Sequence, residues 1–226
     1  MEQLPLFDAA KKGDLEELKK LLKKDDSIND TTKNGISALI LAAEQNNRAV
    51  VDFLLAKGAD PNIKTSMGGT ALSRAAEHGH VEIMEELLGH GAMLDDLALI
   101  SAAREGRLNA VQLLIENGVD INAQQRWGQT ALMLAAREGH SMVVKYLLAH
   151  GANVKTRDKN GDSALSMALD NDHSVIVGQL RRAGAKSHAN NSADADFEEE
   201  EDIDQEPDET DFDELLDEDE MPDDED

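Results

Sequence analysis

The sequence contains no cysteine and very few aromatic residues. Its 226 residues include one Trp, one Tyr and four Phe, so that 3% of the chain is aromatic although 40% is hydrophobic. The absence of cysteine excludes disulfide bonds, thiolate zinc sites and a cysteine nucleophile, and it favours a reducing compartment. Because aromatic side chains are scarce, a folded core must consist mainly of Ala, Leu and Val.

Long apolar runs are missing as well. No stretch approaches the roughly 18 apolar residues that indicate a membrane span. The segment Met1-Glu2-Gln3-Leu4-Pro5 has neither the basic region nor the apolar region of a secretion signal. We therefore expect a soluble, cytoplasmic protein that does not act on a membrane.

The net charge of -25 is distributed unevenly. Residues 194–226 hold 22 of the 47 acidic residues and none of the 22 basic ones, which leaves the preceding part nearly neutral. Like-charge repulsion and a lack of apolar residues oppose folding of such a segment. We expect a folded region at 4–186 and an acidic disordered tail at 187–226. A few apolar residues in the tail form either a partner-binding motif or chance interruptions of a solubilising segment: Phe197, Phe212, Leu215 and Leu216.

An Ala-Ala pair, replaced by Ala-Leu at its sixth occurrence, recurs along the folded region at spacings of 33, 33, 27, 33 and 33 residues. The pairs are Ala9-Ala10, Ala42-Ala43, Ala75-Ala76, Ala102-Ala103, Ala135-Ala136 and Ala168-Leu169. A fixed period of this length is typical of stacked units that cannot bury their apolar faces alone.

The residues around these pairs resemble the ankyrin-repeat pattern T-P-L-H-x-A, with Ala in place of Pro. The matching segments are 37–42, 70–75, 130–135 and 163–168. After each pair come a turn, a second apolar helix and a Gly that caps it, as at Gly58 and Gly151. The resemblance implies an all-α ankyrin-repeat solenoid with β-hairpin fingers and about six helix-turn-helix units, at about 4–31, 32–64, 65–92, 93–124, 125–157 and 158–186.

The 27-residue interval lacks six residues. Residues 91–99 stand where other units have a Gly-tipped finger, so we expect a notch between the finger around 65–69 and the finger around Trp127. Because stability in a repeat array is roughly a sum over neighbouring units, we expect this junction to be the weakest. The first and last units have polar outer faces and are interpreted as caps.

The ankyrin resemblance implies a non-enzymatic adaptor for protein-protein interaction. Its partner would contact the finger tips and the concave face, where residues differ between units while the core letters stay constant. The candidate protein-binding residues are Lys33, Asn34, Glu44, Gln45, Lys64, Met67, Glu77, His78, Arg104, Glu105, Arg126, Trp127, Gln129, Arg137, Glu138, Arg157, Lys159 and Asn160. Trp127 is the strongest candidate, because it is the only Trp and lies at a finger tip. The alternative is that its ring covers apolar surface beside the missing finger.

Other chemistries find little support in the sequence. His78 and His80 have a spacing that suits a metal, but His80 and His140 share a repeat position at which imidazole satisfies backbone groups of the turn. The Gly-rich segment 66–70 lacks the lysine of a phosphate loop. We expect no catalytic, cofactor-binding or metal-binding residue.

The partner is therefore expected to be a protein, bound by a monomer. Direct nucleic-acid binding is disfavoured because the tail would repel phosphates. In the alternative function, the chain is a polyanionic chaperone-like or DNA-mimicking protein that sequesters a basic partner through its tail.

Overall fold

The computed structural model describes residues 4–22 and 27–186, which lie within one unit spanning residues 1–187. This part of the chain is the repeat array. The expected acidic tail, with its apolar residues at 197, 212, 215 and 216, lies outside the described residues.

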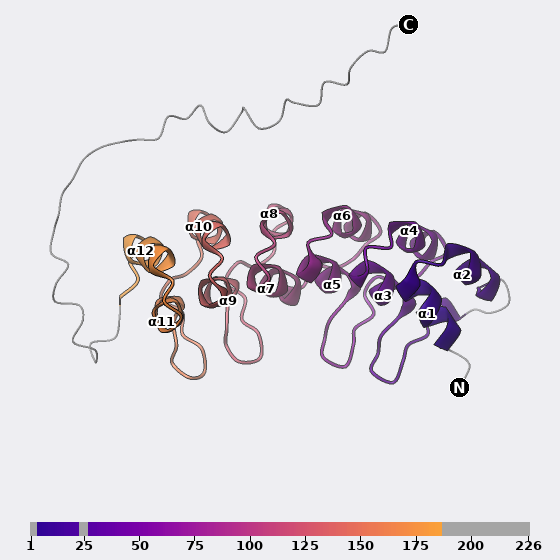
Figure 1. Cartoon of the computed structure of the whole chain (residues 1–226), viewed down its shortest axis with the longest axis horizontal. Helices are drawn as coiled ribbons and strands as arrows, with labels where there is room; N and C mark the ends of the chain where they lie inside the picture. Colours follow the sequence, from indigo (N-terminus) through magenta and orange to yellow (C-terminus); the bar gives the residue numbers. More distant parts are fainter. Residues whose placement is uncertain (1–3, 23–26, 187–226) are drawn as a thin grey trace, which may run out of the picture. The chain divides into compact units, whose positions relative to one another are not determined.

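Twelve short α-helices form six consecutive helix-turn-helix units in the described part of the chain (Figure 1). This arrangement confirms the expected all-α fold. A 3-10 turn at Ser27–Asn29 follows the first unit. The helices are α1 (Leu4–Lys12), α2 (Leu15–Leu21), α3 (Ala38–Glu44), α4 (Arg48–Ala56), α5 (Ala71–His78), α6 (Val81–Gly89), α7 (Asp96–Arg104), α8 (Leu108–Glu116), α9 (Ala131–Glu138), α10 (Ser141–Ala149), α11 (Ala164–Asp170) and α12 (Ser174–Arg182).

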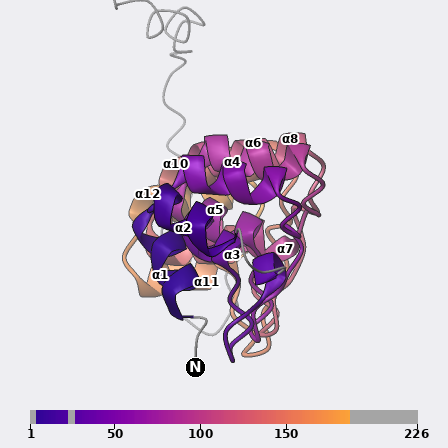
Figure 2. The same cartoon turned by 90° about the vertical axis from the view of Figure 1, so that its right-hand side faces the viewer.

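The helices lie in two layers. The first helices of the units form an inner layer beside the loops, and the second helices form an outer layer above them (Figure 2). The alanines of the repeated pairs are buried where neighbouring inner helices meet, and their small side chains allow close packing. One leucine from each outer helix completes the core, for example Leu54, Leu87 and Leu147, all with no exposed area.

Four loops project from the N-terminal ends of inner helices and are called fingers here: residues 32–36, 65–69, 125–129 and 158–162. In each finger the backbone N–H of the first residue donates to the carbonyl of the last, at 2.8 to 3.0 Å. Each tip glycine has positive φ, between 75° and 88°. The expected hairpins are thus hydrogen-bonded turns. The described residues contain an isolated bridge between Thr31 and Ser37 but no named strand.

The fingers are joined in two pairs. The backbone N–H of Ser66 donates to the carbonyl of Asn34 at 2.9 Å, which joins the first and second fingers. The N–H of Lys159 donates to the carbonyl of Trp127 at 3.0 Å, which joins the third and fourth. The two pairs are separated at the start of the fourth unit, which has no finger (Figure 1).

The junction beside the missing finger, which we expect to be the weakest, is closely packed in the structure. α5 and α7 make the most extensive contact between any two described helices. Asp95 accepts a hydrogen bond from the Thr70 hydroxyl at 2.7 Å and caps α7 by accepting from the Ala98 N–H at 2.7 Å. Leu97 lies beside Gly68 of the second finger. The helices have closed around the deletion.

Every junction also has a side-chain donor at the start of the outer helix. Asn47, His80, Arg107, His140 and His173 occupy equivalent positions and hydrogen-bond to the C-terminal end of the preceding unit's inner helix. Those carbonyls have no partner within their own helix. The expectation that His80 and His140 satisfy backbone groups is confirmed, and the groups belong to the neighbouring unit.

We predict that Asp95→Ala lowers the free energy of unfolding by about 1 to 2 kcal/mol, because it removes a helix N-cap. It also removes the bond to Thr70. Urea unfolding would measure this loss. The matched control is Asp96→Ala, which removes the same charge from an exposed neighbour that is not the cap. Equal losses in the two variants would contradict the structural role of Asp95.

We also predict that His80 makes stability depend on pH. Burial is the main cause that lowers the pKa of His80 below its usual 6.5, and the nearby His78 and Arg107 act in the same direction. The bond to the Glu44 carbonyl and the charge of Glu82 oppose that shift. The unfolded chain therefore binds the proton first, so stability falls as pH drops through the unfolded pKa towards the folded pKa.

The matched variant is His80→Asn, because Asn47 makes the equivalent bond with nearly the same backbone angles. Between about pH 7.5 and pH 5, urea unfolding should show a larger loss of stability for the parent chain than for the variant. Parallel pH profiles would show that His80 does not contribute to the dependence.

Candidate functional site

The predicted binding residues lie in two rows at opposite ends of the inner helices. The helix-end row consists of side chains at the C-terminal ends of α3, α5, α7 and α9: Glu44, Gln45, Glu77, His78, Arg104, Glu105, Arg137 and Glu138. The finger row projects from the other end: Lys33, Asn34, Lys64, Met67, Arg126, Trp127, Gln129, Arg157, Lys159 and Asn160. An eight-residue helix is about 12 Å long, so the two rows are separate parts of one surface.

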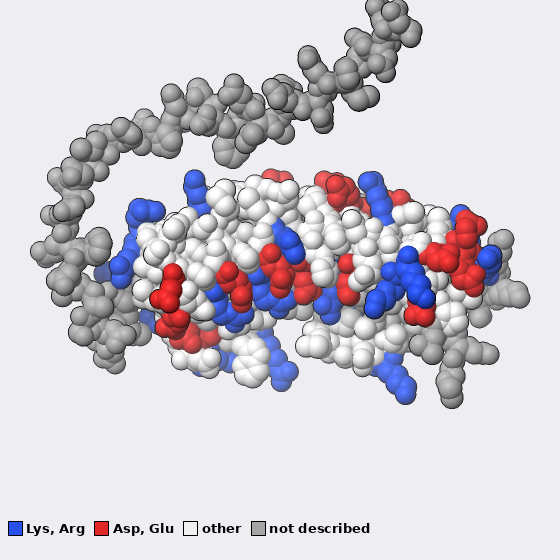
Figure 3. Space-filling model, viewed as in Figure 1, with Lys and Arg blue, Asp and Glu red and all other residues white. Residues whose placement is uncertain are grey.

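Opposite charges in the helix-end row are paired with one another. Glu77 accepts from Arg74 of its own helix at 2.9 Å and from Arg104 of the next unit at 2.8 Å. Arg137 and Glu138 form a further pair at 2.8 Å. Figure 3 shows acidic and basic side chains side by side across this face. Exposed pairs contribute only about 0 to 1 kcal/mol each, so their main effect is to fix a surface of mixed charge.

Arg74 belongs to this surface although the sequence did not single it out. It lies one turn before Glu77 on α5 and is half-buried. Its position three residues before a candidate acid was the available signal, because side chains at that spacing share one helix face.

The finger row combines basic side chains with two apolar tips. Lys33, Lys64 and Lys159 are exposed. Met67 and Trp127 occupy equivalent tip positions in the second and third fingers, and 86% and 62% of their surfaces are exposed. These are the two fingers that border the gap, which interrupts the lower edge of the molecule in Figure 3.

The fingers have internal bonds that use some of the predicted binding side chains. Gln129 accepts from Gln125 at 2.7 Å and donates to Asp158 at 3.4 Å. Arg157 donates to the Gly161 carbonyl at 2.7 Å. The buried Asp158 accepts from two backbone N–H groups of the fourth finger. Gln129 and Arg157 therefore shape the fingers.

Trp127 presents its ring outward. Its carbonyl holds the fourth finger, while its side chain remains mostly exposed. The Arg126 guanidinium lies 5.9 Å from the centre of the indole ring, within the range of a cation-π contact. This position does not fit the alternative in which the ring is folded over the gap.

The described residues contain no group of three or more His, Cys, Asp or Glu side chains placed to hold a metal ion. His80 uses Nε2 on the Glu44 carbonyl at 3.2 Å, and its ring stacks on His78 at 5.7 Å. None of the described helices is long and apolar enough to cross a membrane.

The chain belongs to the ankyrin-repeat family, because the family model for ankyrin repeats (3 copies) matches residues 6–98 and again 99–191. Among curated proteins, the human mitochondrial disaggregase is 40% identical over 58 residues, which are 26% of this chain and 8% of that protein. The chain thus spans only a small part of this relative.

Several solved structures are similar to this chain. The human ASB11 ankyrin repeat domain has a TM-score of 0.73 at 28% identity, over 80% of this chain and 84% of that one. An ankyrin repeat domain from Acinetobacter baumannii AYE has a TM-score of 0.70 at 32% identity, over 82% and 100%. A chain in the complex of the Bd0816 predatory endopeptidase from Bdellovibrio bacteriovorus with immunity protein Bd3460 has a TM-score of 0.71 at 29% identity, over 79% and 97%.

We predict that Trp127→Ala changes the free energy of unfolding by no more than about 0.5 kcal/mol, because the indole is mostly exposed and the finger contact uses the backbone. Urea unfolding is the measurement. A markedly larger loss would mean that the ring packs on the array.

Gly128→Ala is the contrasting variant. A Cβ there would lie 3.2 Å from the Lys159 nitrogen and 3.3 Å from the Asp158 Cα, at a φ of +80°. We expect a loss of about 1 kcal/mol or more from this crowding and strain. Gly161→Ala is the control, because φ there is +88° with nothing within 4 Å of the added Cβ. The difference between the losses of stability in Gly128→Ala and Gly161→Ala then measures how much the pairing of the third and fourth fingers contributes.

Proposed function

We propose that this protein is a non-enzymatic adaptor that binds a protein partner through its finger tips and helix-end row. The exposed pair Met67 and Trp127 at the tips beside the gap is the observation that carries the proposal. Large exposed apolar side chains do not stabilise the array, whereas Trp and Met are enriched at interfaces. Basic neighbours on the fingers would surround this apolar contact with a polar rim.

The family supports a protein ligand in general, because ankyrin repeats are protein-protein interaction modules. One structural neighbour comes from a complex of an endopeptidase with an immunity protein. By analogy, we infer that a folded protein is a suitable partner for the rigid, paired fingers. The monomeric state and the cytoplasmic location remain proposals made from the sequence.

The acidic tail is proposed to modulate this binding. Its 22 acidic residues within 33 positions also favour the second candidate, a polyanion that sequesters a basic protein. Deletion of residues 194–226 separates the two functions, since every described helix ends before residue 186. An adaptor keeps its partner after this deletion, whereas a sequestering polyanion loses it.

We predict that a photo-crosslinking amino acid at position 127 captures the partner in cells. The matched control places the same group at Met142 on α10, which is 60% exposed but lies on the outer layer. With the captured partner purified, calorimetry should show that Trp127→Ala weakens binding by about 2 kcal/mol or more, the usual loss at a hot-spot aromatic. Equal capture at both positions, or unchanged affinity, would exclude the finger tips as the binding site.

A further inference from the structure

Neighbouring fingers are joined by a backbone hydrogen bond whose two groups have fixed positions in the finger. The carbonyl of the third residue, Asn34 or Trp127, accepts from the N–H of the second residue of the next finger, Ser66 or Lys159. All four fingers have the same turn, in which the N–H of the tip glycine donates to the carbonyl of the first residue at 2.8 to 3.0 Å. Each finger therefore presents an acceptor towards the following unit and a donor towards the preceding unit.

At the gap these two backbone groups are unpaired. The acceptor is the carbonyl of Met67 in the second finger, and the donor is the N–H of Arg126 in the third finger. Neither group takes part in a hydrogen bond within residues 4–22 and 27–186. The outer sides of the first and fourth fingers have one such group each, the Lys33 N–H and the Asn160 carbonyl. In this part of the chain, the gap is thus the one place where an unpaired donor and an unpaired acceptor lie on facing sides.

The gap has the width of one finger. α7 packs between α5 and α9, so the second and third fingers are two helix spacings apart, whereas joined fingers are one spacing apart. With packed helices about 10 Å apart, the second and third fingers are roughly 20 Å apart. A single extended strand lies about 5 Å from each neighbour and spans only about 10 Å. A turn as wide as a finger fits this space and reaches both unpaired groups.

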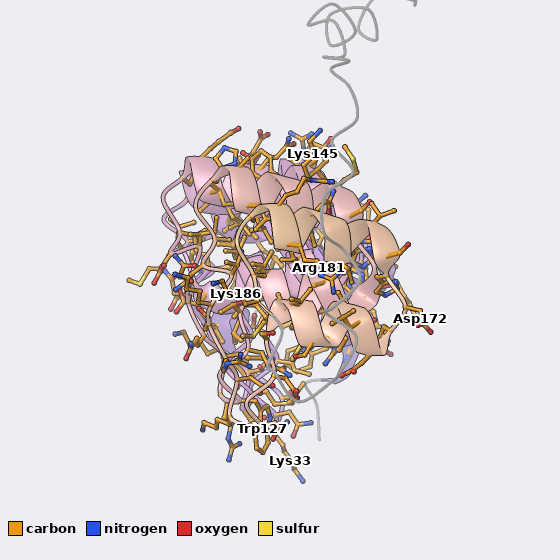
Figure 4. The ribbon with its side chains drawn as sticks, turned by 90° about the vertical axis from the view of Figure 1, so that its left-hand side faces the viewer. Lys33, Trp127, Lys145, Asp172, Arg181 and Lys186 are labelled. Atoms are coloured by element: carbon orange, nitrogen blue, oxygen red, sulfur yellow. The ribbon has the colours of Figure 1, made fainter. Side chains whose placement is uncertain are left out.

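The two fingers beside the gap carry apolar and basic side chains. Met67 and Trp127 are exposed at their tips, and Figure 4 shows Trp127 pointing away from the helices. Lys64, next to the second finger, and Arg126 have exposed side chains that take part in none of the ion pairs of the described residues. Residues 64–69 and 125–129 include no acid. A ligand with apolar and acidic side chains therefore complements both fingers.

We propose that a protruding turn of the protein partner, with apolar and acidic side chains, binds in this gap and takes the place of the missing finger. A backbone N–H of that turn donates to the Met67 carbonyl, and a backbone carbonyl accepts from the Arg126 N–H. Main-chain bonds also give affinity where a partner adds a strand to a sheet edge. The inference rests on the proposed function and deepens it, because it states which part of the partner lies between the two exposed tips.

Amide hydrogen exchange of the full chain, with and without the partner captured at position 127, tests the backbone bond. In the free chain the amides of Arg126 and Lys33 should exchange quickly, whereas those of Ser66 and Lys159 are protected by their bonds. The partner should slow exchange at Arg126 by about tenfold or more, and at the matched Lys33 much less. No change at Arg126, or equal slowing at both amides, would overturn the proposal. Slow exchange at Arg126 in the free chain would also overturn it, because another part of the chain or a second copy would then fill the gap.

A variant that fills the gap tests the occupant in a second way. Replacing residues 95–97 with a copy of residues 29–37 restores the 33-residue spacing and adds a finger with a polar tip. Without any partner, the new finger should slow exchange at Arg126, and it should weaken partner binding by about 100-fold. Urea unfolding establishes that this variant folds, and the exchange experiment on the parent chain decides the question if it does not.

The two proposals fail in different ways. Full affinity of the folded, gap-filled variant would overturn the inference about the gap and leave the proposed function intact. The proposed function fails when position 127 captures no partner more strongly than position 142, or when Trp127→Ala binds the partner as tightly as the parent chain.

Discussion

The structure depends on the close approach of neighbouring inner helices. No unit has a core of its own, and the fully buried alanines allow each inner helix to pack directly against the next. At that separation, one donor such as His140 reaches the carbonyl of Arg104 in the preceding unit. A Cβ on Gly106 would lie 2.5 Å from the His140 ring. Small residues are therefore needed both in the core and beside the donor, which explains why the repeat pattern is so regular.

Because of this constraint, the backbone and the side chain of the same surface residue have different roles. The backbone carbonyls of Glu44, Glu77, Arg104 and Arg137 are used at the junctions, while their side chains face outward. The backbone contacts are indifferent to the side-chain type, so the array can vary its surface without losing a junction bond. The missing finger is likewise a change of the surface that leaves the core intact. Because Asp95 replaces the lost loop by capping α7 directly, the gap between Met67 and Trp127 is compatible with a closed core.

Much of the fold could be predicted from the sequence, because the alanine pairs and the capping glycines recur at fixed spacing. The position of Trp127 at a finger tip could also be predicted from that register. The closed junction at Asp95 could not, since its bond to Thr70 exists only after the deletion brings two helix starts together. The Glu77–Arg104 pair was also missed as a pair, because its partners are 27 residues apart and meet only through stacking. Contacts of this kind depend on geometry between units, which single-sequence patterns do not encode.

The last junction of the array lacks a side-chain contact that three other junctions have. Inside the array, each Asn acceptor meets a backbone donor of the next unit, as Asn122 meets Asn153. At the last junction Lys155 occupies the acceptor position, and its ammonium cannot accept a hydrogen bond from the sixth unit. The substitution that removes this acceptor also makes the surface of the last units basic, because Lys155, Arg157 and Lys186 line the same cavity.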